Sequence, residues 1–475
     1  MYIGRDLELS RRAFMRRSSQ LAAMGAASSY ALGLAGIGEA AAFSTAGDYK
    51  ALVCVFLYGG NDHSNTLIPY DATNYGRYSA IRGGDGVNGG GIALPRASLA
   101  NTVLMPRGNQ TLTDDITYAL APTMPRLKAR FDEGVMAPLL NVGPLVAPLT
   151  KAQYDSGSVP KPAKLFSHND QQSTWQSSEP EGSPSGWGGR MSDLAQSSNT
   201  NAMFTAINAS GNAVFLSGET AVPYQVSPSG ATLFRPLSTG RLYRSGAAAS
   251  ALETILRSGS GHYFAADHAH TNARSIEYGA FVNNALTNAN LSTVFPAGNG
   301  LAAQLQTVAK LISARGSLGV TRQVFMVSMG GYDNHDGLIG QHEGLLGAVD
   351  AALDAFYAAT VELGVANKVT TFTASDFGRT LASNGDGSDH GWGSFHFILG
   401  GDVEGGRFYG RAPSVSVDTP DQVGRGRLLP TVSVDEYSAT FARWFGVSNS
   451  ELPSIAPNIG RFATSDIGFM KPVTP

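Results

Sequence analysis

Three apolar stretches set the strongest limit on how this chain of 475 residues can fold, because each is short, rich in strand-forming residues and followed by an acid. Residues 51–58 and 323–328 are apolar runs, and residues 369–373 are β-branched and aromatic. Such runs predict buried strands of a largely parallel sheet. The carboxyl ends of parallel strands share one edge of the sheet, where ligands bind in open α/β proteins. We therefore expect that edge to gather the carboxylates of Asp62, Asp333 and Asp376.

The stretches between these runs predict helices, and the whole pattern predicts an α/β fold. Residues 338–363 carry apolar side chains at helical spacing between two predicted strands, as in a βαβ unit. Residues 125–133 predict another helix, and residues 135–142 a further strand. Residues 201–319 are irregular, with modest helices among Ser-, Gly- and Ala-rich stretches, and predict an insertion or cap. We expect a largely parallel central sheet with helices on both faces and an irregular helical insertion.

The charge of the chain excludes one broad class of function. Charged residues make up 15% of the sequence, against roughly 25% in typical soluble domains, and the formal net charge is −3. Beyond the N-terminal segment, Lys and Arg do not cluster. Nucleic-acid binding needs a basic surface, so we expect no nucleic-acid partner. The single cysteine, Cys54, lies in the first apolar run, where we expect a buried free thiol.

The N-terminus has the features of an export signal. Residues 10–16 (Ser-Arg-Arg-Ala-Phe-Met-Arg) match the twin-arginine pattern, residues 21–37 are moderately apolar, and residues 40–42 offer small side chains for cleavage. Gly, Ser and Tyr interrupt the apolar run, so we expect no stable membrane span. We divide the chain into a signal peptide, residues 1–42, and one large domain, residues 43–475. The twin-arginine export machinery is then an expected partner, and the expected location is periplasmic or secreted.

The segment after the third strand supplies several candidate site residues. Asp376 follows the strand, Arg379 comes shortly after it, and a polar loop then delivers His390 beside a Gly-rich turn. A carboxylate, a guanidinium and a loop histidine at one strand end indicate a metal or anion site. A surface Asp and a loop His without function explain the pattern equally well. Arg379 itself fits either a clamp on an anionic oxygen or a structural salt bridge.

A further candidate, Ser167, lies at the start of a predicted helix. Asp170 follows it three residues later, and Gln171 comes next, which is typical of a helix N-terminus. A hydroxyl there faces the positive end of the helix dipole, which suits a nucleophile that attacks an anion. A simple N-cap gives the same pattern.

Five motifs occur in order along the chain, and together they resemble a known family. They are Gly-Gly-Asn-Asp at 59–62, Ser-His at 167–168, Tyr-Asp-Asn-His at 332–335, Ser-Asp-Phe-Gly-Arg at 375–379 and Asp-His-Gly-Trp-Gly at 389–393. Behind a twin-arginine signal, this set resembles the domain-of-unknown-function family 1501 over nearly the whole mature chain. That family in turn resembles the alkaline phosphatase and sulfatase superfamily, so the resemblance implies an alkaline phosphatase-like fold.

The resemblance also implies roles for individual residues in a two-metal site. Ser167 falls where that superfamily has its nucleophile. Phe377 departs from the pattern, because those hydrolases usually carry a histidine at this position and a Phe cannot bind metal. The residues that resemble metal ligands are Asp62, Asp333, His335, Asp376 and His390.

These observations predict an exported, metal-dependent hydrolase of phosphate or sulfate esters, with a small anionic ester as its substrate. Mixed Asp and His ligands suit one or two divalent ions, Zn or Mn, with Ca as a further option. The alternative is a degenerate, non-catalytic member of the family that acts as an extracytoplasmic binding or assembly protein. Phe377 favours the alternative, whereas the retained carboxylates and His390 favour the hydrolase.

Overall fold

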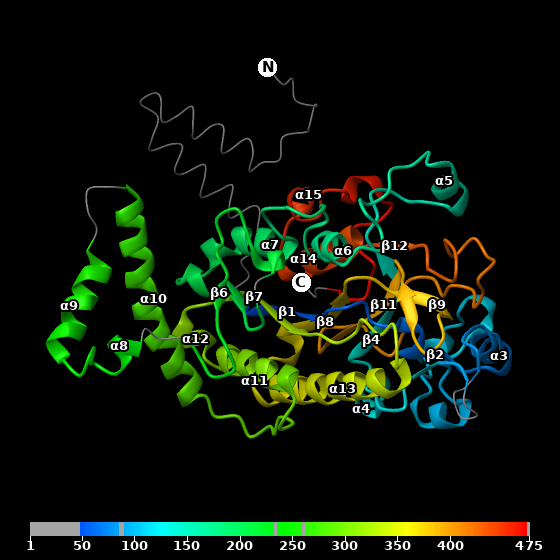
Figure 1. Cartoon of the computed structure of the whole chain (residues 1–475), viewed down its shortest axis with the longest axis horizontal. Coiled ribbons are helices and arrows are strands. Elements are labelled where there is room, and N and C mark those ends of the chain that lie inside the picture. The colour runs from blue at the N-terminus through cyan, green and yellow to red at the C-terminus, as the bar shows by residue number, and fades with distance from the viewer. Residues whose placement is uncertain (1–47, 85–89, 212, 232–234, 259–262, 473–475) are drawn as a thin grey trace, which may run out of the picture.

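The computed structural model describes residues 48–84, 90–211, 213–231, 235–258 and 263–472, so the predicted signal peptide, residues 1–42, lies outside the described residues. The centre of the fold is an eight-stranded sheet (Figure 1). Its strands are β1 (Lys50–Leu57), β4 (Met136–Gly143), β5 (Ala206–Asn208), β6 (Tyr224–Gln225), β7 (Arg322–Met329), β8 (Val369–Ser375), β11 (Ser394–Gly400) and β12 (Val432–Ser433).

Every strand of this sheet except β11 runs in the same direction. The strands lie in the order β12-β4-β11-β8-β1-β7-β5-β6. β1 pairs in parallel with β7 and β8, and β5 with β6 and β7, whereas β11 is antiparallel to both β8 and β4. The prediction of a largely parallel sheet is therefore confirmed. Because β8, β1 and β7 are neighbours, the carboxyl ends of the three predicted strands lie side by side.

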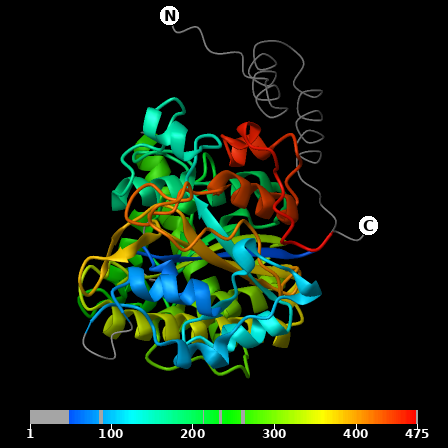
Figure 2. The same ribbon diagram turned by 90° about the vertical axis from the view of Figure 1, so that its right-hand side faces the viewer.

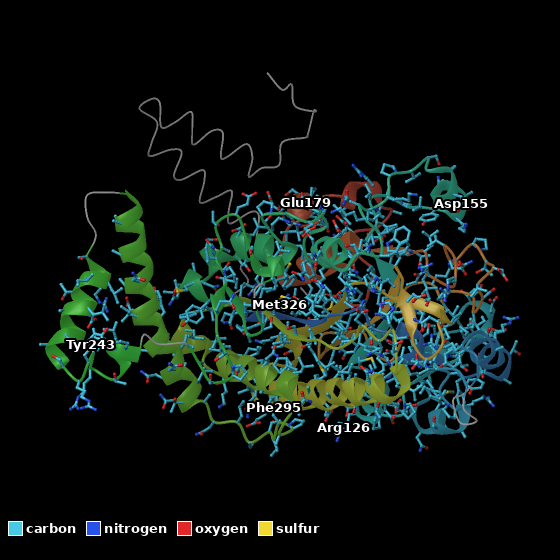
Figure 3. All side chains as sticks on the ribbon, viewed as in Figure 1. Arg126, Asp155, Glu179, Tyr243, Phe295 and Met326 are labelled. Carbon is cyan, nitrogen blue, oxygen red and sulfur yellow. The ribbon has the colours of Figure 1, made fainter. Side chains whose placement is uncertain are left out.

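Helices cover both faces of the sheet, because successive side chains of a strand point to opposite sides (Figure 2). In β1, Val53 and Val55 pack into one core and Cys54 and Phe56 into the other. Cys54 is the buried free thiol that the sequence predicts. Met326 of β7 lies near the middle of the molecule (Figure 3). One face carries α4 (Pro125–Asp132), α11 (Gly300–Ser313) and α13 (Leu338–Glu362); the other carries α6 (His168–Ser177), α7 (Trp187–Ala195), α14 (Val434–Phe445) and α15 (Leu452–Ile455).

Helix α13 is, in the part of the chain that the structure describes, the one helix long and apolar enough to cross a membrane. Its most apolar window has a mean hydropathy of 1.3, and 56% of that window is buried inside the protein. Leu346, Val349 and Phe356 pack into the core below the sheet. The carboxylate of Asp350 also accepts the backbone N–H of Leu127 on α4 at 2.7 Å. These contacts make α13 a core helix of this fold.

The segment predicted as an insertion or cap, residues 201–319, is divided between the body of the protein and an arm. β5 and β6 extend the central sheet, and α11 covers one face of it. The helices α8 (Arg235–Ser238), α9 (Gly246–Arg257) and α10 (Tyr263–Asn288) project from one end of the long axis, with Tyr243 on this arm (Figures 1 and 3). The arm lies at the opposite end from β9, so it does not cover the site described below.

Two short antiparallel ribbons flank the sheet. β9 (Arg379–Ser383) pairs with β10 (Ser388–His390), and β2 (Leu67–Pro69) pairs with β3 (Tyr118–Leu120). In the first ribbon Arg379 lies opposite His390, so the hairpin holds both residues at its open end. Further α-helices of the described residues are α3 (Ala72–Ile81), α5 (Lys151–Ser156) and α12 (Arg315–Leu318).

Candidate metal centre at the carboxyl edge of the sheet

Four side chains from three parts of the chain converge beside the carboxyl ends of β7 and β8, and we call them the histidine–aspartate cluster. They are His168 at the start of α6, Asp333 and His335 in the loop after β7, and His390 at the end of β10. Nε2 of His390 lies 3.1 Å from Nε2 of His168 and 2.9 Å from Nε2 of His335. Carboxylate oxygens of Asp333 lie 3.0, 3.3 and 3.5 Å from Nε2 of His335, His390 and His168.

The opposite ring nitrogen of each histidine faces an acceptor. Nδ1 of His168 lies 2.6 Å from Oδ2 of Asp376, and Nδ1 of His390 lies 2.8 Å from the carbonyl oxygen of Phe166. Nδ1 of His335 lies 3.5 Å from a carboxylate oxygen of Asp389. An acceptor at Nδ1 fixes the proton there and leaves Nε2 as a lone-pair acceptor. Carboxylate or carbonyl partners of this kind commonly orient metal-binding histidines.

The cluster therefore brings ring nitrogens of His168 and His390 and the Asp333 carboxylate together, with Nε2 of His335 beside His390 and Asp333. Such groups repel one another unless a cation or a shared proton lies between them. Three imidazoles and one carboxylate form a donor set that Zn and other transition metals accept. His168, Asp333 and His390 alone place their ligand atoms within 4.8 Å of one another. The residues present thus fit a divalent metal ion.

His168 is the candidate ligand that the sequence prediction omits. It lies in the Ser-His motif at the N-terminus of α6, next to Ser167, which was the residue singled out there. The hydrogen bond with Asp376 raises the pKa of His168, and burial of the ring opposes this effect. The signal available in the sequence was the pairing of this histidine with a helix start and a later Asp motif.

Arg379 does not lie where a substrate could reach it. Its side chain has no exposed surface. Its guanidinium donates to the carbonyl oxygens of Gly59, Gly60 and Ser388 and to Oδ1 of Asp333. The prediction of an anion clamp is therefore corrected: Arg379 forms the alternative, a structural salt bridge. Burial favours protonation of Asp333, but Arg379 and the three neighbouring histidines together outweigh it and lower the pKa of that carboxyl.

Asp62 is the predicted metal ligand that the structure places elsewhere. Its side chain is only 1% exposed, and Oδ2 accepts from Arg82 at 2.7 Å and from Ser388 at 2.6 Å. Oδ1 accepts the backbone N–H of Asn65 at 2.9 Å. Burial alone would raise the pKa of Asp62, yet the Arg82 guanidinium, together with His342, His63 and the Ser388 hydroxyl, holds it well below its usual range. Arg82 thus supplies the positive charge that a metal would otherwise provide, and Asp62 supports the loops beneath the cluster.

Asp376 also lies behind the cluster rather than in it. Oδ2 binds Nδ1 of His168 and accepts from Gln172 at 2.9 Å. Oδ1 is buried without a hydrogen-bond partner among the described residues. The sequence predicts that Asp376 binds the metal itself, but its carboxylate instead orients the candidate ligand His168. The predicted His335, Asp333 and His390 do lie in the cluster, and their metal role stays a prediction.

Ser167 is the N-cap residue of α6, as its sequence context predicts. Its hydroxyl donates to Oδ2 of Asp170 at 2.9 Å instead of capping the backbone. Asp170 is buried, and Lys164 lies 3.5 Å from its other oxygen. Ser167 therefore directly precedes the cluster residue His168, and its hydroxyl is paired with a carboxylate that can accept a proton. Its role as nucleophile stays a prediction.

Two aromatic residues adjoin the cluster, Phe377 through its ring and Phe166 through its carbonyl oxygen. Phe377 is fully buried, and its ring centroid lies 4.9 Å from that of His168 and 4.6 Å from that of His390. Phe166 has a φ of 74°, a left-handed conformation that bulky residues rarely adopt. This conformation accompanies the bond from Nδ1 of His390 to the Phe166 carbonyl. Backbone strain of this kind is concentrated at functional sites.

Cationic side chains lie next to the cluster. Arg427 donates to the carbonyl oxygen of His390 at 2.7 Å, and its guanidinium carbon lies 5.1 Å from the Phe166 ring centroid. Arg425 lies 2.8 Å from a carboxylate oxygen of Asp389 and is about half exposed. Together with Lys164, these groups make the surroundings of the cluster attractive to an anion.

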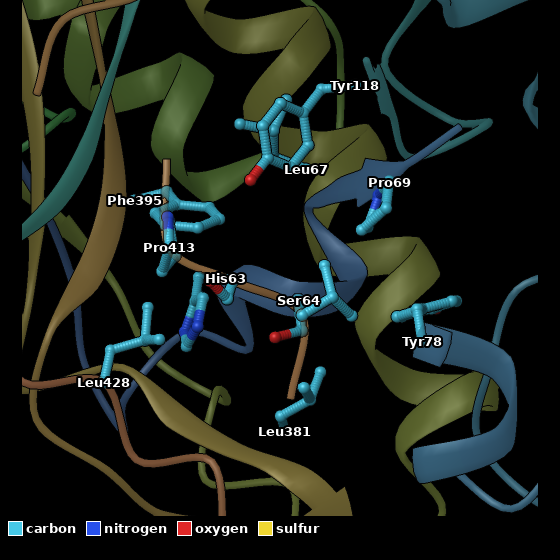
Figure 4. A pocket seen from close by; sticks show the side chains of 12 residues that line it. His63, Ser64, Leu67, Pro69, Tyr78, Tyr118, Leu381, Phe395, Pro413 and Leu428 are labelled. Atoms are coloured by element: carbon cyan, nitrogen blue, oxygen red, sulfur yellow. The ribbon is translucent and has the colours of Figure 1, made fainter. Parts of the chain in front are cut away.

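The cavity beside the Asp62 loop is too small to be the substrate site. It holds about 30 Å³ and is lined by mostly apolar side chains around His63, including Leu67, Tyr118 and Phe395 (Figure 4). A cavity of this size accommodates one or two water molecules.

The buried histidines around this region predict that the protein is sensitive to acid. Burial lowers the pKa of His63 and His342 to about 4 and that of His396 to about 3. All three values lie below the usual 6.5, so between about pH 6.5 and 4 the unfolded chain binds more protons than the folded chain. Stability is therefore complete above pH 6.5 and falls below it, by on the order of 2 kcal/mol per histidine at pH 5.

Urea unfolding of the metal-free protein at pH 7.5 and pH 5 measures this effect. The total is comparable with the 5–15 kcal/mol stability of typical domains, so we expect a markedly lower midpoint at pH 5. Equal midpoints at the two pH values would show that these histidines are not buried in neutral form.

The fold and the cluster together define an α/β protein with a candidate metal centre at the carboxyl edge of its sheet. The chain belongs to the family described as Protein of unknown function (DUF1501), whose model matches residues 49–451. The family predicted from the five motifs is thereby confirmed. Among curated proteins, no sequence matches this chain.

The solved structures that the chain resembles include sulfatases and an alkaline phosphatase. The lipoteichoic acid synthase LtaP from Listeria monocytogenes is 9% identical, with a TM-score of 0.31, and the match covers 86% of this chain and 74% of that one. The sulfatase PsFucS1 from Pseudoalteromonas sp. is 11% identical, with a TM-score of 0.33 and coverage of 86% and 70%. A variant of the alkaline phosphatase PafA is 11% identical, with a TM-score of 0.21 and coverage of 70% and 64%. Likenesses this distant assign no activity to the chain.

Proposed function

We propose that this protein is a metal-dependent hydrolase of phosphate or sulfate esters and that the histidine–aspartate cluster holds its metal. One observation carries the proposal: ligand atoms of His168, Asp333 and His390 lie within 4.8 Å of one another, Nε2 of His335 lies 2.9 Å from that of His390, and every Nδ1 faces an acceptor. A cation bound there would act as a Lewis acid on an ester oxygen. The neighbouring Arg425, Arg427 and Lys164 support an anionic substrate.

We infer a single Zn or Mn ion. Ca binds six to eight oxygen ligands, and a cluster with three imidazoles does not offer them. Asp62 is neutralised by Arg82, and Asp376 is engaged by His168 and Gln172, so neither carboxylate is free to build a second centre.

The remaining parts of the reaction fall to residues near the start of α6. Ser167 stands at the positive end of the helix dipole, where a negative charge on the ester is stabilised. Oδ2 of Asp170 accepts a hydrogen bond from the Ser167 hydroxyl at 2.9 Å, a position that suits a base activating a nucleophilic hydroxyl. Asp376 and the Phe166 carbonyl keep His168 and His390 in the orientation that the metal requires.

The proposal includes export by the twin-arginine machinery to the periplasm or the exterior. Residues 10–16, 21–37 and 40–42 support it by their sequence. The described chain begins at the amino end of β1, whereas the cluster lies at the carboxyl ends of β7 and β8.

A non-catalytic metal-binding or assembly protein is the second candidate. The observation in its favour is Phe377, whose ring packs against His168 and His390 at a position where catalytic relatives are expected to have a further ligand. Under this alternative the cluster holds a metal, but no ester is hydrolysed.

Chromogenic phosphate and sulfate esters test the proposal on protein loaded with Zn or Mn. We expect hydrolysis that a chelator abolishes and the metal restores. Ser167→Ala should lower kcat by about 10²-fold or more while metal content is unchanged, because only the nucleophile is removed. Ser156→Ala, an exposed serine on α5, is the matched control. If Ser167→Ala retained full activity, water would replace Ser167 as nucleophile, and a metal-loaded protein inactive on both ester classes would favour the second candidate.

A further inference from the structure

An open groove begins beside the cluster and follows the carboxyl edge of the sheet, and we call it the α6 groove. It consists of two adjoining depressions of about 270 Å³ and 360 Å³. Ser183, Ala213 and Val214 line both depressions, so the two share a wall. Tyr58, which follows β1, lines the first depression, and Gln225 of β6 lines the second. The second depression is within the size range of small-molecule sites, about 300–1,000 Å³, and the first is just below it.

Helix α6 connects this groove to the cluster. Asn169, Gln172, Ser173 and Gln176 line the groove, and their spacing of three and four residues puts them on one helix face about 10 Å long. His168, the cluster residue, immediately precedes this face. Gln172 also donates to Oδ2 of Asp376, the oxygen that binds His168. Asn169 directly follows the cluster residue His168, so this end of the groove lies within one helical turn of the cluster.

The groove combines polar, nearly uncharged side chains on α6 with apolar ones in the second depression, among them Pro184, Val214 and Pro223. Among its described lining residues the only charged one is Glu181, which lies 3.9 Å from Lys164. The polar side chains are amides and hydroxyls, which both donate and accept hydrogen bonds. The cations lie elsewhere: Arg427 contacts His390 of the cluster, and Arg425 contacts Asp389 beside it. The ligand expected from this division is anionic at the cluster and neutral along the groove.

We propose that the α6 groove binds a neutral oligosaccharide chain and that the ester at the cluster is carried by one of its sugars. Resting on the proposed function, this inference names the class of alcohol in the substrate. Sugar hydroxyls match paired donors and acceptors on Asn, Gln and Ser side chains. A nucleic acid or another anionic polymer would find no cationic side chain among the described residues that line the groove. An acyl chain would leave the amides of the groove without hydrogen-bond partners.

Binding of neutral hexasaccharides to the purified chain tests the inference without any hydrolysis. The probes are hexasaccharides of glucose, galactose, mannose and N-acetylglucosamine, measured by titration calorimetry. We expect at least one to bind, and Asn169→Ala to weaken it by about tenfold, as the loss of one or two hydrogen bonds implies. Ala213→Trp, which fills the wall common to both depressions, should abolish binding with metal content unchanged. Ala247→Trp, on exposed α9, is the matched control.

The inference would be overturned by binding of none of the hexasaccharides, or by equal affinity in Ala213→Trp. Binding of a neutral hexapeptide or a phosphatidylcholine vesicle in place of the sugars would also overturn it. The proposed function fails independently, because a chain that binds sugars but hydrolyses no ester keeps the groove inference. A chain that hydrolyses small esters but binds no sugar keeps the proposed function alone.

Discussion

Asp333→Ala is expected to release the metal, whereas Asp336→Ala is expected to retain it. Both changes remove a carboxylate from the same loop, but only Asp333 has an oxygen 3.0 Å from Nε2 of His335 and 3.3 Å from Nε2 of His390. Losing Asp333 removes the only charged ligand of the cluster and leaves imidazoles alone to hold a divalent ion. We expect the affinity to fall by more than the 10–100-fold that follows loss of a ligand's supporting residue.

The same experiment separates ligands from their supports. His168→Ala should behave like Asp333→Ala, whereas Asp376→Asn, which keeps the side-chain shape but loses the charge beside Nδ1 of His168, should weaken binding by only about 10–100-fold. Elemental analysis after dialysis against graded chelator measures each affinity. Full metal retention in both His168→Ala and Asp333→Ala would disprove the cluster as the metal site.

Asp62→Asn is expected to destabilise the fold by about 3–5 kcal/mol without affecting the metal. The substitution leaves the Arg82 guanidinium buried and without its charged partner, which is the costly case for an internal ion pair. The double variant Asp62→Asn with Arg82→Met should recover part of the loss, because it removes both charges. Urea unfolding measures the stability, and elemental analysis measures the metal in the folded protein.

Asp155→Asn is the matched control for this prediction. It breaks the exposed pair of Lys151 and Asp155, for which we expect a change of less than about 1 kcal/mol. If Asp62→Asn instead lost the metal with little change in stability, Asp62 would be the ligand that its motif suggests.

The sequence predicts the centre of the fold well because buried parallel strands have an unusual composition. The runs at residues 51–58, 323–328 and 369–373 correspond to β1, β7 and β8, and few other structures place such apolar segments before glycine and acid. Helix α14 is absent from the prediction, although its capping box of Ser433 and Glu436 is a readable start signal. β11 is also absent, since its short apolar run follows a glycine-rich turn and does not show its direction.

The site is less predictable than the fold because its chemistry depends on partners distant in sequence. Nothing near Asp62 in the motif indicates that Arg82, on the following helix end, neutralises it. The burial of Arg379 against the carbonyl oxygens of Gly59 and Gly60 likewise depends on contacts between segments that are distant in sequence. The motifs identify which loops meet at the edge, but they do not determine which oxygen or nitrogen of each loop faces the metal.

The reversed direction of β11 has a consequence for how the protein comes together. A strand that runs against its neighbours starts at the edge where they end, so the residues just before β11, including His390, arrive at the same edge as those after β7. The cluster thus joins positions 168 and 390, and it exists only once strands from most of the chain have paired. Metal uptake then reports completed folding, and a bound ion adds to the stability of the finished protein alone, by RT ln(1 + [metal]/Kd).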